Sequence, residues 1–191
     1  MKKCFKLLFV IVIFSSTLLA QDGLIKSYYQ NKMLKQIENF KNGKLEGENK
    51  YYTNDGILKE IINYKHGVKN GLSFSYSPEG ILKEIITYKN NKYNGEFRSF
   101  HENGALKEAG YYNDGQFSDE YKAFYDMGEL MMISHFENGK RIGNSKEYFK
   151  NGMLKTEAVF TNGIQSGTTK WYYESGKLRG NYNYETNQLD G

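Results

Sequence analysis

A repeat of 24 residues is the feature that most constrains the fold of this 191-residue chain. When the sequence is cut after Gly23 and every 24 residues thereafter, it divides into seven segments that align without a gap. The segments are 24–47, 48–71, 72–95, 96–119, 120–143, 144–167 and 168–191. A fixed period of this kind is typical of a repeat architecture, in which each unit packs mainly against its neighbours.

Three positions, numbered within each segment, keep the same kind of side chain throughout. Position 5 is always aromatic, position 11 is always Leu, and position 17 is again always aromatic. Because side chains alternate along a strand, these odd-numbered positions are expected to share one face of a sheet. The expected structural core is Tyr28, Leu34, Phe40, Tyr52, Leu58, Tyr64, Tyr76, Leu82, Tyr88, Phe100, Leu106, Tyr112, Phe124, Leu130, Phe136, Tyr148, Leu154, Phe160, Tyr172, Leu178 and Tyr184.

Turn residues lie between these columns. Position 9 is Gly in six segments, and position 20 is Gly in five and Asn in two. Glycine, and next asparagine, adopt a positive φ at little cost. Runs such as 102–104 (Glu-Asn-Gly) and 137–139 (Glu-Asn-Gly) are therefore predicted to be hairpin loops, as type I turns closed by a glycine bulge.

This loop placement predicts a register in which position 5 faces position 11 and position 3 faces position 13. It puts Lys50 opposite Glu60 and Arg98 opposite Glu108, and on the other face Trp171 lies opposite Arg179. The predicted fold is an all-β, elongated array of β-hairpin repeats that forms one continuous, twisted antiparallel sheet with open ends. Since exposed end strands can pair with other edges, weak end-to-end self-association is also expected.

The first 20 residues have the order of a secretory signal peptide. Three lysines precede an apolar run over residues 7–19, and Ala20 offers a small residue at the cleavage point. The run is shorter than the roughly 20 residues that span a bilayer. Residues 1–20 are thus predicted to be a signal peptide and 21–23 a short lead-in, which implies a periplasmic, cell-surface or secreted protein. Retention as an N-terminal anchor is the alternative.

The charge balance gives no support to a nucleic-acid partner. The whole chain carries +4, with 26 basic and 22 acidic residues, but three of the basic residues lie in the predicted signal peptide. The remainder is close to neutral, which differs from the strongly basic footprint of nucleic-acid-binding domains. The single cysteine, Cys4, also lies in the predicted signal, so no disulfide framework is expected.

The repeat motif can be compared with known families. In the sixth segment it comprises Tyr148, Asn151-Gly152, Leu154, Phe160 and Asn162-Gly163, between Gly143 and Gly167. This pattern resembles the MORN repeat, and most closely the bacterial variant in YwqK-type antitoxin-like repeat proteins. The resemblance covers residues 24–191. It implies a scaffold or adaptor without a catalytic motif, associated in bacteria with toxin neutralisation or host contact; an exported antitoxin would need a target outside the cytoplasm.

No residue pattern indicates catalysis, a metal or a cofactor. His66, His101 and His135 fall in different segments and at different repeat positions, so they predict no shared site. The sequence lacks a nucleophile elbow and a phosphate-binding loop. Carboxylates occur singly in turns and ladders. The sequence therefore predicts a non-enzymatic protein.

Binding has better candidates, on the face opposite the expected core. An aromatic residue adjoins several core columns, a basic row occupies position 12, and two methionines replace Lys and Glu in the fifth segment. The candidate contact residues are Tyr29, Tyr51, Tyr125, Phe149, Trp171, Tyr173, Lys35, Lys59, Lys83, Lys107, Lys155, Arg179, Met131 and Met132. A partly apolar, basic face suits another protein. Cell-wall glycan and anionic lipid headgroups are the alternative partners, and β-propensity alone would also explain the extra rings.

Overall fold

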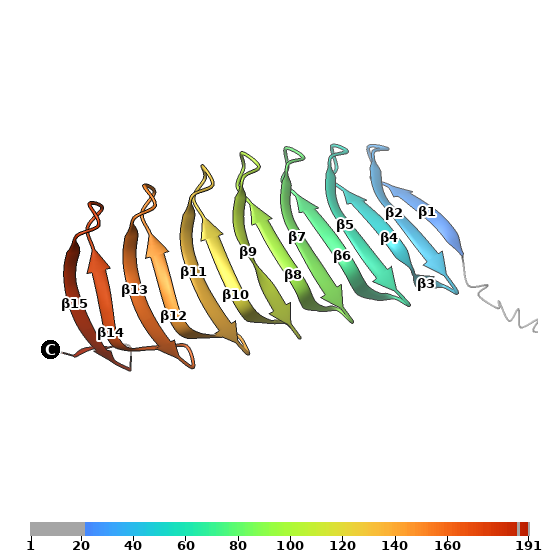
Figure 1. The fold of residues 1–191 in the computed structure, drawn as a ribbon. Coiled ribbons are helices and arrows are strands. Elements are labelled where there is room, and N and C mark those ends of the chain that lie inside the picture. The colour runs from blue at the N-terminus through green and yellow to red at the C-terminus, as the bar shows by residue number, and fades with distance from the viewer. Residues whose placement is uncertain (1–21, 187, 191) are drawn as a thin grey trace, which may run out of the picture.

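The computed structural model describes residues 22–186 and 188–190, so the predicted signal peptide lies outside the described residues. The described chain forms a single antiparallel sheet of 16 strands that follow one another in chain order (Figure 1). The sheet is open at both ends and has no covering layer. The predicted all-β array of hairpins is confirmed.

The strands of neighbouring segments have closely similar bounds. They are β1 (Gly23–Tyr28), β2 (Leu34–Lys41), β3 (Lys44–Leu45), β4 (Gly47–Tyr52), β5 (Leu58–Lys65), β6 (Val68–Tyr76), β7 (Leu82–Lys89), β8 (Lys92–Phe100), β9 (Leu106–Asn113), β10 (Gln116–Phe124), β11 (Leu130–Glu137), β12 (Lys140–Tyr148), β13 (Leu154–Thr161), β14 (Ile164–Tyr172), β15 (Leu178–Glu185) and β16 (Gln188–Asp190). The short strand β3 pairs only with β2.

Each segment has two loops, the first around position 9 and the second around position 20. The first loop has the predicted turn. In the loop between β8 and β9, the Gly104 N–H donates to the His101 carbonyl (2.9 Å), and the His101 N–H donates to the Ala105 carbonyl (2.8 Å). Gly104 has a φ of +81°. A type I turn followed by a residue with positive φ is the three-residue hairpin loop with a glycine bulge.

The second loop differs from the prediction. Between β11 and β12, both Asn138 (φ +49°) and Gly139 (φ +75°) have positive φ, and the flanking residues Glu137 and Lys140 pair directly. Positive φ at both central residues defines a two-residue type I′ turn, whose twist matches that of the strands. The predicted type I turn with a bulge was therefore wrong for this loop.

The predicted register is correct next to the first loop and wrong beyond it. Position 5 pairs with position 11, as in Tyr52 with Leu58, but a bulge follows at once, so Tyr51 pairs with Glu60 and Lys50 with Ile61. The other predicted pairs are shifted in the same way. Arg98 lies opposite Ala109 instead of Glu108, and Trp171 lies opposite Gly180 instead of Arg179. The extra residue breaks the alternation on which the prediction depended.

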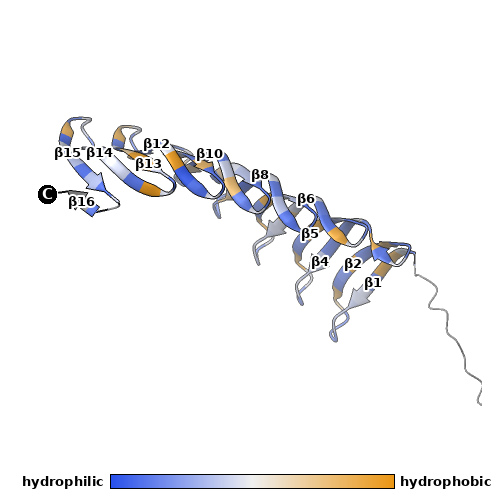
Figure 2. Cartoon of the chain, turned by 90° about the horizontal axis from the view of Figure 1, so that it is seen from below, coloured by the Kyte–Doolittle hydropathy of each residue, from blue (hydrophilic) through white to orange (hydrophobic). Residues whose placement is uncertain are grey.

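A second irregularity occurs at position 24, where one segment passes into the next. Gly71 and Gly95 have φ values of +104° and +117°, and the register with the preceding strand shifts beside them. In the fourth segment Asp119 takes this place with a φ of +61°. Bulges bend strands and increase their twist. The hairpins are accordingly bent along their length, and the sheet forms a long trough (Figure 2).

Burial is concentrated on one face, which we call the inner face. Antiparallel partners share a face, so positions 2, 4, 13, 15 and 17 all lie on it. Ile62, Ile86 and Phe97, at positions 15 and 2, are 7%, 5% and 7% exposed. The outer face is the opposite side, with residues such as Leu72. The core columns named from the sequence are mostly half-buried, and Tyr28 and Leu178 are 58% and 51% exposed.

Aromatic rings fill the middle of the inner face. The rings of Tyr88 and Tyr93 meet edge-on with centroids 5.0 Å apart. Tyr112 stacks on Phe117 at 4.2 Å, and Phe117 lies 5.5 Å from Phe136. These rings come from positions 17 and 22, which pair across the second loop. They give the single-layer sheet the packed interior that it otherwise lacks.

Candidate binding site

The structure does not bring the predicted contact residues together on one face. Tyr51 and Trp171, at position 4, lie on the inner face, opposite Glu60 and Gly180. The isoleucines of position 14, such as Ile61, lie on the outer face. The candidate rings at position 6 belong to the first loops: Tyr29, Tyr125, Phe149 and Tyr173. The bulge separates these groups, because it changes which residues share a face.

The two inner-face rings are partly buried and contact other side chains. The Tyr51 hydroxyl donates to a Glu38 carboxylate oxygen (3.3 Å), and burial raises the pKa of Tyr51 well above its usual range. Trp171 meets Tyr182 edge-on, with centroids 6.3 Å apart. The Trp171 indole N–H is buried and has no hydrogen-bond partner among the described residues.

Two of the loop tyrosines act between segments. The Tyr29 hydroxyl donates to the Tyr52 carbonyl (2.7 Å), and the Tyr125 hydroxyl donates to the Tyr148 carbonyl (2.8 Å). Each bond joins position 6 of one segment to position 5 of the next. Phe149 lacks a hydroxyl and makes no such bond. These contacts stabilise the array and leave little of the two hydroxyls free for a partner.

The basic row and the methionines are dispersed as well. Lys59 lies 3.9 Å from Glu60, and Lys155 lies 3.6 Å from Glu147. Lys35 and Arg179 lie over the rings of Tyr29 and Tyr173. Lys107 and Met131 line one small hollow. Met132 places its sulfur 4.0 Å from Arg141.

A hollow of about 310 Å³ opens on the inner face across the second and third segments, and we call it the inner hollow. Its floor is formed by buried residues, and its walls carry charges and tyrosine rings. Its lining includes Lys59, Glu60, Ile62, Lys69, Ser73, Lys83, Glu84, Ile86, Tyr88 and Tyr93. The Lys69 ammonium lies 5.0 Å from the centroid of the Tyr88 ring, an attractive cation–π distance.

Two polar groups in the inner hollow lack partners. Ser73 is 5% exposed, and its hydroxyl makes no hydrogen bond with any described residue. Glu84 accepts no hydrogen bond from a described residue, whereas its neighbour in the row, Glu108, accepts from the Ser99 and Tyr121 hydroxyls, both at 2.7 Å. Burial raises the pKa of Glu84, although nearby Lys83 opposes this. A buried polar group without a partner costs free energy, and a ligand can remove that cost.

The unpartnered carboxylate has a measurable consequence. At pH 7 burial penalises the charged form of Glu84, so Glu84→Gln is expected to raise the free energy of unfolding. Because the folded-state pKa lies above the unfolded one, this gain should shrink as pH falls and vanish below about pH 4, where the carboxyl is protonated in both states. Urea unfolding from pH 7 to pH 3.5 measures it.

Glu79 supplies the opposite control. The Ser77 side chain holds the pKa of Glu79 below its usual range, so Glu79→Gln should lower stability at pH 7, and this loss should also disappear in acid. A gain from Glu84→Gln that stays constant down to pH 3.5 would contradict the assignment of a destabilising charge in the inner hollow.

The histidines and carboxylates of the described residues are dispersed. Within residues 22–186 and 188–190, no group of three or more His, Cys, Asp or Glu side chains could hold a metal ion. His66 lies 3.6 Å from Glu46, while His101 bonds the Phe124 carbonyl. This part of the chain also has no helix that could span a bilayer.

Sequence reasoning named Lys59 and Lys83 but missed the glutamates and the serine of the inner hollow. The glutamates of position 13 (Glu60, Glu84 and Glu108) recur at the 24-residue period and could have been noticed. Ser73 gave no signal, because position 2 varies among Ile, Asn, Ser, Phe, Tyr and Thr. Only the bulged register shows that both positions face the same hollow.

Comparisons with solved structures and curated proteins add little. The crystal structure of the GtfA/B complex bound to UDP and GlcNAc is similar over 60% of this chain, with 14% identity and a TM-score of 0.25. The chain spans only 22% of that protein's chain, and a similarity at this TM-score carries no argument about fold or function. The search of curated proteins gave no match.

The family comparison is informative. The MORN repeat variant matches six segments: 21–42, 45–66, 69–90, 93–114, 141–162 and 165–186. Residues 117–138 are not matched, although β10 and β11 pair there with the same bulged register as the other hairpins. The matched segments cover more than half of the chain and coincide with its hairpins, which are repeat units of a non-enzymatic type. The chain belongs to the MORN repeat variant family.

Proposed function

We propose that this protein is an exported, non-enzymatic scaffold that binds a partner protein in its trough. The observation that carries the proposal is the inner hollow, where the buried Ser73 hydroxyl has no partner among the described residues. Beside it the half-buried Glu84 carboxylate accepts no hydrogen bond from a described residue. A ligand that supplies hydrogen-bond donors there would remove the cost of both groups. The seven 24-residue segments act as seven repeats, of which the second and third form the site.

The mixed chemistry of the inner hollow favours a protein. Lys59, Lys69 and Lys83 line the inner hollow together with Glu60 and Glu84, so it offers both charges to a partner. A polypeptide presents donors, acceptors and apolar groups together, whereas an anionic headgroup would meet the glutamates unfavourably. Neutralisation of a toxin outside the cytoplasm and contact with a host or cell surface are the two settings that we propose for this binding.

The test fills the inner hollow without disturbing the sheet. Ser73→Phe introduces at position 2 the residue that the array itself has one segment later, at Phe97. We expect the variant to remain folded and to lose at least tenfold in affinity, about 1.4 kcal/mol. Partners are captured from an extract with the chain lacking residues 1–20, identified, and titrated against both forms.

Leu72→Phe is the matched control, because Leu72 adjoins Ser73 but lies on the outer face and is 47% exposed. It adds bulk on the opposite side of the same strand and should leave capture unchanged. The proposal fails if no protein is recovered above the level of an array with scrambled surface residues. It also fails if the two phenylalanine variants capture the partner equally well.

A cell-wall glycan is a second candidate, at a different place. Trp171, Arg179, Tyr182 and Tyr184 line an open hollow of about 210 Å³ near the C-terminal end. The unpartnered indole N–H and the exposed ring of Tyr182 suit a sugar, which stacks on rings and accepts hydrogen bonds. The chain should then sediment with cell-wall material, and Trp171→Ala should abolish this. Sedimentation with anionic liposomes that weakens with salt would point to a lipid surface instead.

Export is tested separately. Residues 1–20 are fused to a reporter enzyme that is active only outside the cytoplasm, and we expect activity together with cleavage after Ala20. Replacing two leucines of the apolar run with aspartates should abolish export. Activity without cleavage would identify a retained anchor, and no activity would remove export from the proposal.

A further inference from the structure

The first loops of neighbouring segments are tied together by side chains that reach from one loop to the next. Position 6 provides the first tie: its Tyr29, His101 and Tyr125 side chains bond the carbonyl at position 5 of the next segment, at 2.7, 3.0 and 2.8 Å. These bonds join hairpins at the loop edge of the sheet, in addition to the strand pairing.

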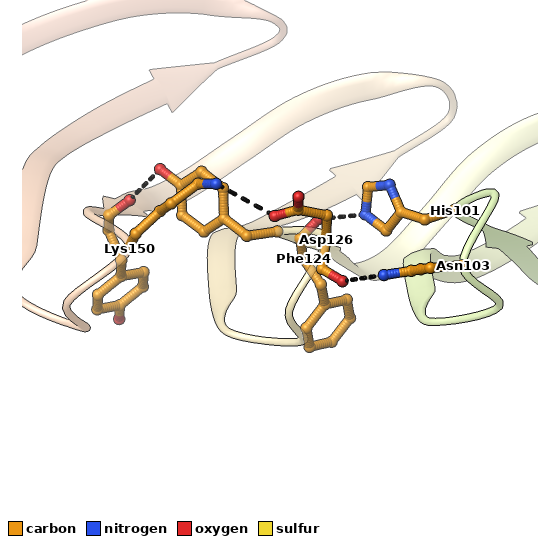
Figure 3. Close-up of polar contacts among 7 residues, drawn as sticks. His101, Asn103, Phe124, Asp126 and Lys150 are labelled. Atoms are coloured by element: carbon orange, nitrogen blue, oxygen red, sulfur yellow. Dashed lines mark hydrogen bonds and ion pairs between the residues drawn. The ribbon is translucent and has the colours of Figure 1, made fainter.

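An asparagine at position 8 provides the second tie. The amides of Asn31, Asn103 and Asn151 donate to the carbonyl at position 7 of the next segment, at 2.7, 2.6 and 3.0 Å. Figure 3 shows the first and second ties at the junction of the fourth and fifth segments, where His101 bonds the Phe124 carbonyl and Asn103 bonds the Asp126 carbonyl. Lys150 then reaches back to the Asp126 carboxylate (3.1 Å).

An apolar residue at position 10 provides the third tie. Ile57 Cγ2 lies 3.6 Å from the point where a Cβ on Gly80 would lie, and the Met153 sulfur lies at the same distance from that point on Gly176. These side chains close the space between adjacent loops. The second segment has neither of the first two ties, since it carries Thr53 and Asp55, but Ile57 closes its gap.

Among the described loops, only the junction of the third and fourth lacks all three ties. The Ser77 hydroxyl turns onto its own loop and accepts from the Glu79 and Ile81 N–H groups, both at 3.3 Å. Glu79 is a carboxylate and cannot donate as asparagine does. No atom lies within 4 Å of the Cβ point on Gly104, so Ile81 does not close this point as Ile57 does at Gly80.

A hollow of about 760 Å³ occupies this junction, and we call it the loop hollow. Its volume is within the range of ligand sites, roughly 300–1,000 Å³. Its lining includes Tyr76, Ser77, Pro78, Glu79, Ile81, Leu82, Lys83, Phe100, His101 and Lys107. Tyr76, Phe100 and Ile81 provide apolar surface, and the Phe100 carbonyl is the acceptor that corresponds to those bonded by Tyr29 and Tyr125.

Lys83 shows which group is missing from the loop hollow. At the same position 12, Lys35 and Arg179 place their charges 5.9 Å from the rings of Tyr29 and Tyr173, which stand at position 6 of their own segments. The residue at position 6 of the Lys83 segment is Ser77, so Lys83 has no ring at that position to cover. The junction thus keeps the cation of the third segment and the acceptor of the fourth, but lacks the phenol that lies between the corresponding groups at Tyr29.

We propose that the loop hollow takes a tyrosine side chain of the partner protein, which donates its hydroxyl to the Phe100 carbonyl beneath Lys83. This rests on the proposed function, because it names the side chain that the partner presents. The array supplies the argument for the occupant, since tyrosine fills the equivalent place at Tyr29 and Tyr125. The hydroxyl satisfies a backbone acceptor, and the ring packs against Tyr76 and Ile81.

The experiment titrates two small-molecule probes into the chain that lacks residues 1–20. N-acetyltyrosinamide at millimolar concentration should shift the amide NMR signals of Ser77, Glu79 and Gly104, and N-acetylphenylalaninamide should bind about fivefold more weakly because it lacks one hydrogen bond. Ser77→Tyr should abolish the shifts by filling the hollow from within. Leu72→Phe, on the exposed outer face, should leave them unchanged.

Each outcome decides the proposal. Equal binding of the two probes, shifts scattered over other loops, or no shifts at all would overturn it, and this comparison on the unmodified chain stands even if Ser77→Tyr does not fold. Failure of the proposed function looks different: no partner is captured, or Ser73→Phe has no effect on capture, while the probe titration still reports on the loop hollow alone.

Discussion

Replacing Phe97 with alanine is expected to lower the free energy of unfolding by about 3–5 kcal/mol, the range for removing a buried aromatic side chain. Phe97 is 7% exposed, and its ring lies 5.6 Å from Tyr112 and 6.2 Å from Phe117. It therefore belongs to the ring cluster that gives the middle of the single-layer sheet its interior. Urea unfolding followed by circular dichroism measures the loss.

Leu72→Ala is the control for this prediction. Leu72 lies on the outer face, is 47% exposed, and should cost under about 1 kcal/mol. If the two alanine variants lose the same amount, the inner face is not the core of the array. Because units of a repeat array contact mainly their neighbours, the Phe97 variant should also unfold with lower cooperativity, the two halves separating.

Gly95→Ala is expected to cost about 3 kcal/mol. Gly95 has a φ of +117°, and an alanine Cβ would lie 3.0 Å from the Thr87 Cβ. The backbone conformation costs an L-residue about 1–2 kcal/mol, and forcing apart a packed contact adds about 1–3 kcal/mol. The free energy of unfolding in urea measures the sum.

Gly167 occupies the same repeat position and isolates the backbone part of this cost. It has a φ of +72°, and no atom lies within 4 Å of its Cβ point. Gly167→Ala should therefore lose only about 1–2 kcal/mol. Equal losses at Gly95 and Gly167 would show that the close approach of Thr87 contributes nothing.

The array was predictable from the sequence because its signals recur. One hairpin with Asn-Gly between apolar runs is a weak indication, but the same spacing in seven aligned segments leaves few other folds open. Register was predictable only beside the first loop, where Tyr52 pairs with Leu58. The bulge that follows has no residue signature of its own, and it reassigned Tyr51 and Trp171 to the inner face.

The hollows were predictable only in part. The change from tyrosine to Ser77 at position 6 can be read in the sequence, but Thr53 is an equally short residue one segment earlier. What distinguishes them is spacing in three dimensions, because Ile57 lies close to the glycine of the next loop, Gly80, and no atom lies close to the corresponding point on Gly104. Side-chain reach across a curved sheet depends on twist and bend, which a residue pattern does not specify.

The ties between first loops also give the molecule a polarity. Every hydroxyl and amide in them donates toward the C-terminal neighbour, as Tyr29 does to Tyr52 and Asn151 to Glu174. In the described ties, each loop thus offers either backbone acceptors to the neighbour before it in the chain or side-chain donors to the neighbour after it. Two copies that continued this pattern along the axis would have to join unlike ends, and such a contact does not close on itself.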